Sequence, residues 1–563
     1  MPNHCMFTRR HVVKGGAAAI AAATSPAART CPVTDHQPTV TGIVFEDLSG
    51  AGMRGPGGPG IADVLVSNGR DVVRTDSEGR YTLPVGDEAI IFVVKPTGYS
   101  VPIDHDVKLP RFYYIHQPRG TPAHLGLYDR GIPPTGQLPG SIDFALKKKP
   151  EPTRFDVILF TDPHADGAAA IDYIRTDVVN ALVGTKAAFG MTLGDLMSDD
   201  LSFYSRYNRV IGRIGIPWYN ISGNHDLNFE ARDRKYSRET FRRIFGPDYY
   251  AFEYGGALFL MLDNVDYLGN GRYQGRFGER QLAFVADVLR ETPADRLVVV
   301  AMHIPLRTYL DPDDPTINTS DGVELLKILG DRPAVSFSGH THTTEHHYLN
   351  NGSSNVLAHH HHVLTALSGS WWSGPYDHRG VAVADSPDGN PNGFHVLSVD
   401  GNRYTAQFCP AKESGTRQVR VVLESEARKR TTTDNDVGLG PLFGSPIPQN
   451  IVCMTDVIVN VFDGGPRTTV EYRIDGFETV RMKPTRRRDP FVQEVFAANQ
   501  ATKKPWAQAE LCSHVWTARL PADLEAGTHC IMVRVVDEYG REHHDCLCLE
   551  VISTPAPQAL VRG

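Results

Sequence analysis

The sequence lacks a long apolar stretch. Beyond the first block of residues, no apolar run approaches the roughly 18–20 residues that a membrane-spanning helix requires. We therefore expect no membrane span once the N-terminal segment is set aside.

An excess of basic residues is also missing. The formal net charge is −8 and the isoelectric point is about 6.3. Proteins that bind nucleic acid usually present a basic surface, so we expect no nucleic-acid partner.

Cysteine is scarce, and no two cysteines have the CxxC spacing of a zinc knuckle. Setting aside Cys5, which lies near the N-terminus, seven cysteines remain. They are Cys31, Cys409, Cys453, Cys512, Cys530, Cys546 and Cys548. Five lie beyond residue 450, which leaves two interpretations open. The last part of the chain has one or two disulfides outside the cytoplasm, or it has buried free thiols.

The N-terminal residues have the order of an export signal. An arginine pair, Arg9-Arg10, is followed by the weakly apolar run Gly15–Ala23 and by small residues around Ser25-Pro26-Ala27. This order resembles a twin-arginine signal peptide, predicted for residues 1–30. It implies transport by the twin-arginine machinery to the periplasm or the outside of the cell. The alternative is an ordinary terminus in which two arginines adjoin by chance.

With 563 residues, the chain is too long for one hydrophobic core, and roughly two to four domains are expected. Residues 38–148 are predicted to form an N-terminal β-sandwich that serves as an accessory domain, because short strand-like runs alternate with turns. These runs are Ile43–Phe45, Val64–Val66, Tyr81–Leu83 and Ile90–Val94.

Residues 152–408 alternate between strand-like and helical patterns, which predicts a largely buried α/β sheet with helices on its faces. The strand-like runs are Phe155–Phe160, Ala187–Leu193, Ile216–Ile221, Leu297–Ala301 and Ala334–Phe337. The helical patterns are Ala168–Val183, Leu201–Ile214, Glu279–Glu291 and Asp321–Leu329.

Residues 409–555 return to a β pattern and are predicted to form a C-terminal β domain. The strand-like runs are Val419–Leu423, Asp456–Phe462, Thr468–Ile474, Val515–Leu520 and Ile531–Val536. The boundary with the central domain is placed near Cys409, and a boundary as early as residue 360 stays open.

Short stretches of His, Asp and Asn follow each strand-like run of the central part within about four residues, the place where open α/β sheets form their sites. They are Asp162-Pro163-His164, Gly194-Asp195, Gly223-Asn224-His225-Asp226, His303 and Gly339-His340-Thr341-His342. Glycine at 194, 223 and 339 fits tight turns that would let the side chains converge.

These residue types suit the hydrolysis of a phosphate ester. Two metal ions roughly 3.5–4 Å apart lower the pKa of a bound water and neutralise charge at phosphorus. Holding them requires a shared carboxylate, with imidazole and oxygen donors completing each set. The stretches supply such donors for two divalent or trivalent ions, with Mn, Fe and Zn all open as their identity.

In order and residue type, the five stretches resemble the calcineurin-like metallophosphoesterase superfamily over about residues 154–345. The resemblance implies a four-layer α-β-β-α sandwich between the two β domains. It also implies a ligand set: Asp162, His164 and His342 for one metal ion, Asn224, His303 and His340 for the other, and Asp195 as the bridge. His225 would be the general acid or stabiliser beside the leaving group, oriented by Asp226, and a metal-bridging hydroxide would attack.

The flanking parts resemble a bacterial exported subgroup of the same superfamily, through Ser368–Trp372, Asp388–Gly393 and Asp537–Arg541. An envelope-derived phosphoester is then one candidate for the small substrate, either a monoester or a diester. Purple acid phosphatases, a related branch, have a tyrosine ligand three residues after the bridging aspartate. Ser198 occupies that position here, which argues against an iron–tyrosinate centre.

Two further segments leave their roles open. In a strand, His359–His362 would place two rings on each face, so substrate contact, metal scavenging and surface display are all compatible. Trp371 and Trp372 would either wall the pocket or pack a domain junction. The rival function is a cell-envelope binding protein with a vestigial central domain, which the complete ligand set argues against.

Overall fold

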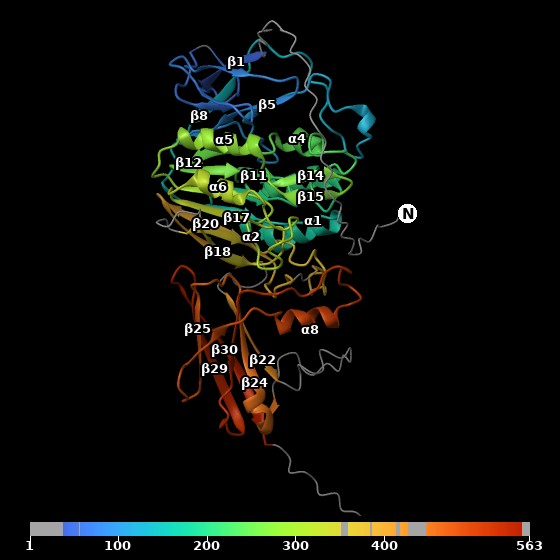
Figure 1. Ribbon diagram of the computed structural model, residues 1–563, viewed down its shortest axis with the longest axis vertical. Coiled ribbons are helices and arrows are strands. Elements are labelled where there is room, and N and C mark those ends of the chain that lie inside the picture. The colour runs from blue at the N-terminus through green and yellow to red at the C-terminus, as the bar shows by residue number, and fades with distance from the viewer. Residues whose placement is uncertain are drawn as a thin grey trace, which may run out of the picture. The chain divides into compact units, whose positions relative to one another are not determined.

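Two mixed sheets form the central part of the chain (Figure 1). The computed structural model describes residues 38–55, 57–350, 358–382, 385–411, 417–425 and 446–553. The predicted signal peptide, residues 1–30, lies outside these residues. Among the described residues, no helix is long and apolar enough to span a membrane.

The first central sheet has the strand order β11-β10-β9-β20-β21. β9, β10 and β11 run parallel, whereas β20 is antiparallel to β9 and β21 is antiparallel to β20. The strands are β9 (Arg154–Phe160), β10 (Phe189–Leu193), β11 (Trp218–Ile221), β20 (Gly393–Asp400) and β21 (Arg403–Pro410).

The second central sheet has the order β12-β13-β16-β17-β19-β18. Its four inner strands are parallel, and β12 and β18 are antiparallel strands at the two edges. The strands are β12 (Tyr250–Tyr254), β13 (Ala257–Met261), β16 (Val298–Ala301), β17 (Ala334–Ser338), β18 (Glu345–Leu349) and β19 (His359–Val363).

Aromatic side chains join the two central sheets in one core. Tyr219 of β11 stacks on Phe252 of β12 with ring centroids 4.0 Å apart, and Phe189 of β10 meets Phe259 of β13 edge to face at 5.1 Å. Large rings bury much apolar area for each residue, so this layer contributes strongly to stability.

Helices and a hairpin complete the central part. The helices are α1 (Ala168–Ile174), α2 (Asn180–Leu182), α3 (Tyr204–Ile211), α4 (Glu239–Phe245), α5 (Glu279–Arg290) and α6 (Gly322–Leu329), and the hairpin is β14 (Val265–Gly269) with β15 (Arg272–Gly275). Buried residues of α5 and α6 belong to a large core that also contains buried residues of both central sheets and of the N-terminal sheets, whereas those of α1 and α3 pack with Ile158, Phe160 and Trp218 in a second core. The helix expected over 168–183 is interrupted by a π-helical turn, Arg175–Val179, and the one expected over 201–214 begins and ends in 3₁₀ turns.

Before the central part, residues from Pro38 onward form two sheets of four strands, β4-β1-β8-β6 and β3-β2-β5-β7. Their strands are β1 (Thr39–Glu46), β2 (Leu65–Ser67), β3 (Val72–Arg74), β4 (Arg80–Pro84), β5 (Ala89–Val94), β6 (Tyr99–Ser100), β7 (Tyr113–His116) and β8 (Phe144–Lys148). A short 3₁₀ turn, Ala123–Leu125, follows β7.

After the central part, a four-stranded sheet, β22-β24-β28-β27, and a five-stranded sheet, β23-β30-β29-β25-β26, share a third core. The strands are β22 (Val419–Ser425), β23 (Ile447–Pro448), β24 (Thr455–Val461), β25 (Thr469–Ile474), β26 (Val480–Arg481), β27 (Lys483–Pro484), β28 (Val515–Arg519), β29 (Gly527–Val536) and β30 (Glu542–Ile552), and the helix is α8 (Pro490–Ala498). The mixed α/β character predicted from the sequence is confirmed.

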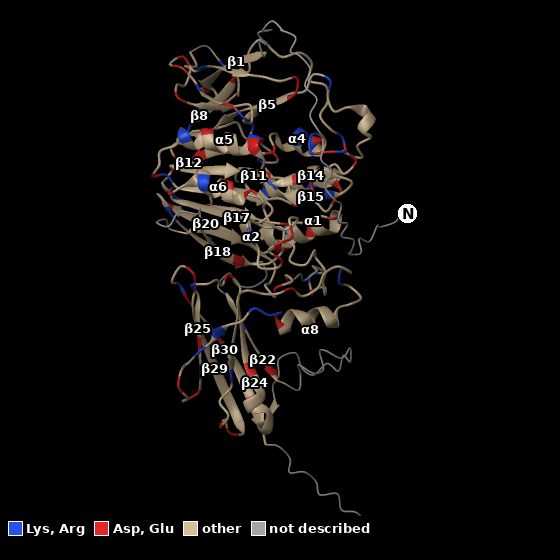
Figure 2. Cartoon of the chain, in the orientation of Figure 1, with Lys and Arg blue, Asp and Glu red and all other residues tan. Residues whose placement is uncertain are grey.

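Opposite charges lie close together around the central helices (Figure 2). Arg242 of α4 pairs with Glu239 at 3.1 Å and with Asp248 at 2.6 Å, and Arg290 of α5 pairs with Asp287 at 2.6 Å.

The cysteines of the described residues are free thiols, at positions 409, 453, 512, 530, 546 and 548.

Candidate metal centre

The expected ligands follow the carboxyl ends of parallel strands in both central sheets. Asp162 and His164 follow β9, Asp195 follows β10, Asn224 follows β11, His303 follows β16, and His340 and His342 follow β17. All seven are brought together in one centre, at the strand edge where open α/β sheets form sites.

The backbone of the ligand loops adopts a conformation that is rare outside glycine. φ is positive at Asp162 (49°), His164 (44°), Asp195 (51°), His340 (74°) and His342 (57°). Hydrogen bonds between loops hold these residues, since the amide of Asp162 donates to the Gly194 carbonyl at 3.2 Å and that of His164 to the Asp195 carbonyl at 3.0 Å. Such strained residues cluster at functional sites, where they aim side chains that a relaxed backbone would direct elsewhere.

Glycine allows the loops to approach one another closely. A Cβ on Gly223 would lie 2.1 Å from Oδ1 of Asp195, and one on Gly339 would lie 2.2 Å from Oδ2 of Asp162. No side chain fits at either distance, so these two positions require glycine and let the carboxylates sit against the neighbouring loop.

The first group of ligands consists of Asp162, His164 and His342, all of them buried. Nε2 of His164 lies 2.9 Å from Nε2 of His342, and Oδ1 of Asp162 lies 3.9 Å and 3.7 Å from these two nitrogens. The outer nitrogens are held: Nδ1 of His342 donates to the Gly369 carbonyl at 2.6 Å, and Nδ1 of His164 lies 3.0 Å from Oγ of Ser198.

The second group consists of Asn224, His303 and His340. Nε2 of His303 lies 2.9 Å from Oδ1 of Asn224 and 3.1 Å from Nδ1 of His340. The outer nitrogens again meet backbone carbonyls, with Nδ1 of His303 donating to Leu193 at 2.9 Å and Nε2 of His340 donating to Thr316 at 3.0 Å.

Asp195 lies between the two groups. Its Oδ2 is 3.5 Å from Nε2 of His164 in the first group and 3.2 Å from Nε2 of His303 in the second. One carboxylate oxygen therefore faces ligands of both groups, which is the position that a bridging ligand occupies.

This donor set fits two cations. Each outer imidazole nitrogen that donates to a carbonyl leaves a lone pair on the inner nitrogen of a neutral ring. In the first group the inner nitrogens of His164 and His342 face each other at 2.9 Å. In the second, Nε2 of His303 lies 2.9 Å from Oδ1 of Asn224 and 3.2 Å from Oδ2 of Asp195. Burial lowers the pKa of His303, but Asp195 outweighs it and raises that pKa to about 9, so a proton on this ring supplies the positive charge that a metal ion would bring. Carboxylate, amide and imidazole acceptors that lie this close together require a positive charge among them. Imidazole with carboxylate is a ligand set that suits Mn, Fe or Zn.

The pKa values reflect the same crowding. Burial, together with the charge of Asp195, raises the pKa of Asp162 to about 7, although His303 opposes them. Burial raises the pKa of Asp195 too, but His303 and His225 outweigh it and hold the pKa of Asp195 well below its ordinary value. Burial lowers the pKa of His340 to about 3 and that of His342 to about 4, so these rings are neutral at pH 7.

His225 lies at the rim of the centre with its side chain 35% exposed. Its ring centroid is 5.0 Å from that of His164, and its amide donates to Oδ1 of Asp195 at 2.8 Å. Nδ1 of the ring lies 2.6 Å from Oδ1 of Asp199, which leaves Nε2 as the free nitrogen. Burial lowers the pKa of His225, but the charges of Asp195 and Asp199 outweigh it and raise that pKa to about 9.

The carboxylate against the His225 ring is therefore Asp199, whereas the sequence interpretation gave that task to Asp226. Asp226 is fully buried and accepts hydrogen bonds from the amides of Gly223, Leu196 and Met197 and from the Tyr204 hydroxyl. It ties the loop after β10 to the loop after β11. The sequence reasoning missed Asp199 because its contact with a residue 26 positions away becomes visible only once both loops are traced.

The two tryptophans have different surroundings. The ring of Trp371 stacks on His342 with centroids 4.2 Å apart and meets Trp506, beyond α8, edge to face at 6.3 Å. Trp372 is buried, and its Nε1 donates to the Pro163 carbonyl at 3.1 Å. Trp371 thus walls the centre, and Trp372 packs beneath the first ligand loop.

His359–His362 are the first four residues of β19, and three of the four rings are buried, which excludes surface display for these three. His359 and His361 contact Oγ of Ser336, each at 2.8 Å. Nε2 of His361 also accepts from the amide of Leu306 at 3.1 Å, close to the His303 loop. His360 and His362 lie on the opposite face of the strand.

Three family models match the chain. The model for calcineurin-like phosphoesterase matches residues 155–344, that for the N terminal of calcineurin-like phosphoesterase matches residues 49–125, and that for its C terminal matches residues 361–543. No match was found among curated proteins.

Solved structures with limited similarity include two phosphatases. A dimetal phosphatase from Danio rerio is 15% identical and covers 47% of this chain and 98% of its own, with a TM-score of 0.33. A purple acid phosphatase from seeds of yellow lupin (Lupinus luteus) is 13% identical and covers 62% of this chain and 67% of its own, with a TM-score of 0.34.

Proposed function

This chain belongs to the calcineurin-like phosphoesterases, with the N- and C-terminal regions of that family, and on this premise we propose that it hydrolyses small phosphate monoesters or diesters at a dinuclear metal centre. The observation that carries the proposal is the position of Asp195, whose Oδ2 faces His164 of one ligand group and His303 of the other. Metal-dependent phosphoester hydrolysis is the chemistry of the family.

Each ligand group would hold one ion: Asp162, His164 and His342 the first, Asn224, His303 and His340 the second, and Asp195 both. When bound, two such ions neutralise the charge of the phosphate and lower the pKa of a water molecule that attacks phosphorus. The carbonyls of Gly369, Leu193 and Thr316 fix the ring orientations and hold the proton of each neutral ring on its outer nitrogen, so that the inner nitrogen would be the metal ligand.

His225 would donate a proton to the leaving oxygen. Its ring is the partly exposed imidazole at the rim, and Nδ1 is bound to Asp199, so Nε2 is the atom that can reach a substrate. A proton on the leaving group lowers the barrier for breaking the P–O bond, because the departing alkoxide would otherwise carry a full negative charge.

The wall beside the centre favours a substrate with a flat or apolar part. Trp371 stands over His342, and Trp506 stands 59% exposed at its edge. Lys504 lies 5.9 Å from the centroid of the Trp506 ring and pairs with Asp166 at 2.6 Å, which places a cation at the same rim. The aromatic face suits the organic part of an anionic ester, and the cation suits its negative charge.

The finer features of the sequence interpretation are part of the same proposal. We propose that the two central sheets and their helices form a four-layer α-β-β-α sandwich, with β-sandwiches over residues 38–148 and 409–555 and the catalytic domain over 152–408. We also propose export by the twin-arginine route to the periplasm or outside the cell, which Arg9-Arg10 and the following apolar run support. An envelope-derived phosphoester is then a candidate substrate.

The test combines metal analysis with hydrolysis of p-nitrophenyl phosphate and bis(p-nitrophenyl) phosphate. We expect bound metal and turnover of at least one ester after loading with Mn²⁺, Fe²⁺ or Zn²⁺. In Asp195→Asn and His303→Ala we expect loss of turnover and of the metal held at the dinuclear centre. The relative rates on the two esters distinguish a monoesterase from a diesterase. A protein that binds no metal and hydrolyses neither ester would instead support the rival binding-protein function.

A further inference from the structure

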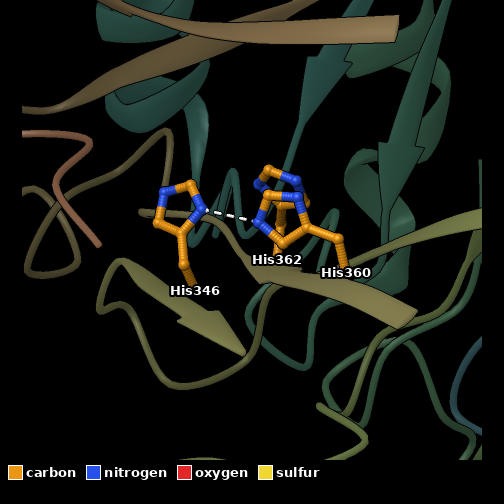
Figure 3. Close-up of side chains that lie close together, drawn as sticks. All are labelled: His346, His360 and His362. Atoms are coloured by element: carbon orange, nitrogen blue, oxygen red, sulfur yellow. Dashed lines mark hydrogen bonds between the residues drawn. The ribbon is translucent and has the colours of Figure 1, made fainter. Parts of the chain in front are cut away.

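Three buried histidine rings meet outside the dinuclear centre (Figure 3). His346 lies on β18, and His360 and His362 lie on the neighbouring strand β19, where His346 is paired with His362 in register. Alternate residues of a strand share a face, so all three rings project to the same side of the sheet. A nitrogen of each ring lies within 4.8 Å of a nitrogen of the other two.

The outer nitrogen of each ring is held by an oxygen. Nε2 of His346 lies 3.1 Å from Oδ1 of Asp463, Nδ1 of His360 lies 2.8 Å from the Tyr404 hydroxyl, and Nε2 of His362 lies 3.2 Å from the Tyr539 hydroxyl. Metal-binding histidines usually have their second nitrogen bound to a carboxylate, carbonyl or other oxygen, which fixes the ring and its tautomer. The surroundings of this cluster match that pattern.

The inner nitrogens have an incomplete set of partners. Nδ1 of His346 and Nε2 of His360 face each other at 3.0 Å. Within the described part of the chain, Nδ1 of His362 has no hydrogen-bond partner, although this side chain is fully buried. A buried polar atom normally has a partner, so the unpaired nitrogen is a second observation that points to a bound group.

We propose that His346, His360 and His362 bind a further metal ion, separate from the two at the dinuclear centre, and that this ion is Zn²⁺. Neutral imidazole nitrogens are good zinc ligands. With zinc–nitrogen bonds of about 2.0–2.1 Å, neighbouring ligand nitrogens in a tetrahedral site are roughly 3.3 Å apart. The distance of 3.0 Å between His346 and His360 requires only a small adjustment to reach that geometry.

The electrostatics of the cluster agree with this assignment. Burial lowers the pKa of His360 to about 2 and holds the pKa of His362 well below its ordinary value, so both rings are neutral at pH 7 and each has a lone pair. Because Oδ1 of Asp463 accepts from Nε2 of His346, the lone pair of a neutral His346 ring is on Nδ1, the nitrogen that faces His360. Burial lowers the pKa of His346, but the hydrogen bond and charge of Asp463 outweigh it and raise that pKa. His360 and His362 therefore offer their lone pairs directly, and a metal ion would displace a proton from His346.

The ion would connect the second central sheet, which contains β18 and β19, with the C-terminal sheets, which contain β24, β29 and β30. The three ligands come from β18 and β19, whereas Asp463 follows β24 and Tyr539 lies between β29 and β30. Nε2 of His395, on β20, lies 3.5 Å from the same oxygen of Asp463. Zinc bound here would stabilise this junction without taking part in the reaction.

The experiment is the zinc content of the purified full-length chain after loading with Zn²⁺ and removal of free metal. In a background variant with Asp195→Asn and His303→Ala, which disables the dinuclear centre, we expect about one zinc ion per chain. Adding His362→Ala to this background is expected to remove that zinc and its effect on the thermal unfolding midpoint. The matched control adds His361→Ala, whose ring lies on the other face of β19, and is expected to retain the zinc.

Zinc that persists in the His362→Ala variant, or a background variant that holds none, would overturn the proposal. Circular dichroism checks the fold of each variant, and if His362→Ala does not fold, His360→Gln in the same background provides the decisive measurement. The dinuclear centre is judged separately, from the zinc that the wild-type chain holds beyond the background variant.

Discussion

At the scale of single residues, two carboxylates near His225 make different kinds of contact. Asp199 contacts the ring, while Asp226 accepts hydrogen bonds from three backbone amides and a hydroxyl. Removing the first should therefore change turnover, and removing the second should change the ligand loops themselves.

We expect His225→Ala to lower kcat by about 10²–10⁴-fold while the metal content stays unchanged, because the proposed role of the ring is to donate a proton and not to bind metal. Asp199→Asn should give a smaller decrease, since it alters only the orientation and charge of the ring. Asp226→Asn should instead reduce metal content, because its amide group would face backbone donors. Steady-state kinetics on p-nitrophenyl phosphate and mass-spectrometric metal analysis measure these effects. Loss of metal in His225→Ala would contradict the assignment.

Gly223 offers a second test at this scale. A Cβ at this position would meet Oδ1 of Asp195 at 2.1 Å, so Gly223→Ala should displace the Asp195 carboxylate, the proposed bridge, and weaken metal binding at both ligand groups. We expect at least a tenfold loss of metal affinity, a free-energy change of about 1.4 kcal/mol. Gly140→Ala, where a Cβ meets nothing within 4 Å, is the control. Equal metal affinity in the two variants would show that the loop after β10 adapts.

At the scale of elements, the turn between β29 and β30 is organised by Asp537. Its carboxylate accepts from the amides of Tyr539 and Arg541 and pairs with Nε of Arg541 at 2.6 Å and Nε2 of His543 at 3.0 Å. Burial raises the pKa of Asp537, but the hydrogen bonds from His543 and Arg541 outweigh it and lower that pKa to about 2.

A depressed pKa in the folded state stabilises the protein above the ordinary pKa and is lost as the pH falls through the folded value. Asp537 should therefore contribute about 1–2 kcal/mol at pH 7, and this contribution should disappear between about pH 4 and pH 2. Urea unfolding of the wild type and Asp537→Asn at several pH values measures it. A difference in unfolding free energy that stays constant from pH 7 to pH 3 would assign the effect to packing.

The elements that precede the ligands were the most predictable from sequence. β9, β10, β11, β16 and β17 are short apolar runs followed by polar turns, and each lies within the range predicted for it or one residue beyond. By contrast, β12 and β13 were not predicted, although the sequence has a hairpin signal there: Gly255-Gly256 separates Tyr250–Tyr254 from Ala257–Met261. β30 was missed because it alternates exposed and half-buried residues over most of its length, so its core face is weakly apolar.

The residues of the site also divide into those that could be predicted from the sequence and those that could not. Ligands could be predicted because each is tied to a strand end by a few residues of local sequence. Contacts such as those of His225 with Asp199 and His346 with Asp463 depend on how distant segments meet, for which the sequence has no local signal.

At the scale of the whole molecule, a buried ion pair links the N-terminal sheets to the central part. Nζ of Lys95, after β5, lies 2.5 Å from both Oε1 of Glu151 and the Glu253 carbonyl. Oε2 of Glu151 accepts from the amides of Gly98 and Gly255, each at 3.0 Å. The side chains of Lys95 and Glu151 are 6% and 1% exposed.

Lys95→Met should lower the free energy of unfolding by about 3–5 kcal/mol, because it leaves the Glu151 carboxylate buried without a counter-charge. Combining it with Glu151→Gln should restore part of the loss, since the amide oxygen still accepts from Gly98 and Gly255 and no charge remains. Denaturant unfolding of both single variants and the double variant gives the coupling between the two residues. If the double variant were as unstable as the sum of the singles, the pair would not act as a unit.

The position of Trp371 should make the fluorescence of the protein sensitive to metal binding. Its indole stacks on His342, so the emission of this one tryptophan should respond when a paramagnetic ion such as Mn²⁺ occupies the neighbouring ligands. Trp506 lies edge to face with the Trp371 ring. A substrate that binds between these two indoles would therefore change the emission of Trp371 independently of metal binding. Comparison with Trp371→Phe would isolate this emission, and the chain would then report the filling of its own active centre without an added dye.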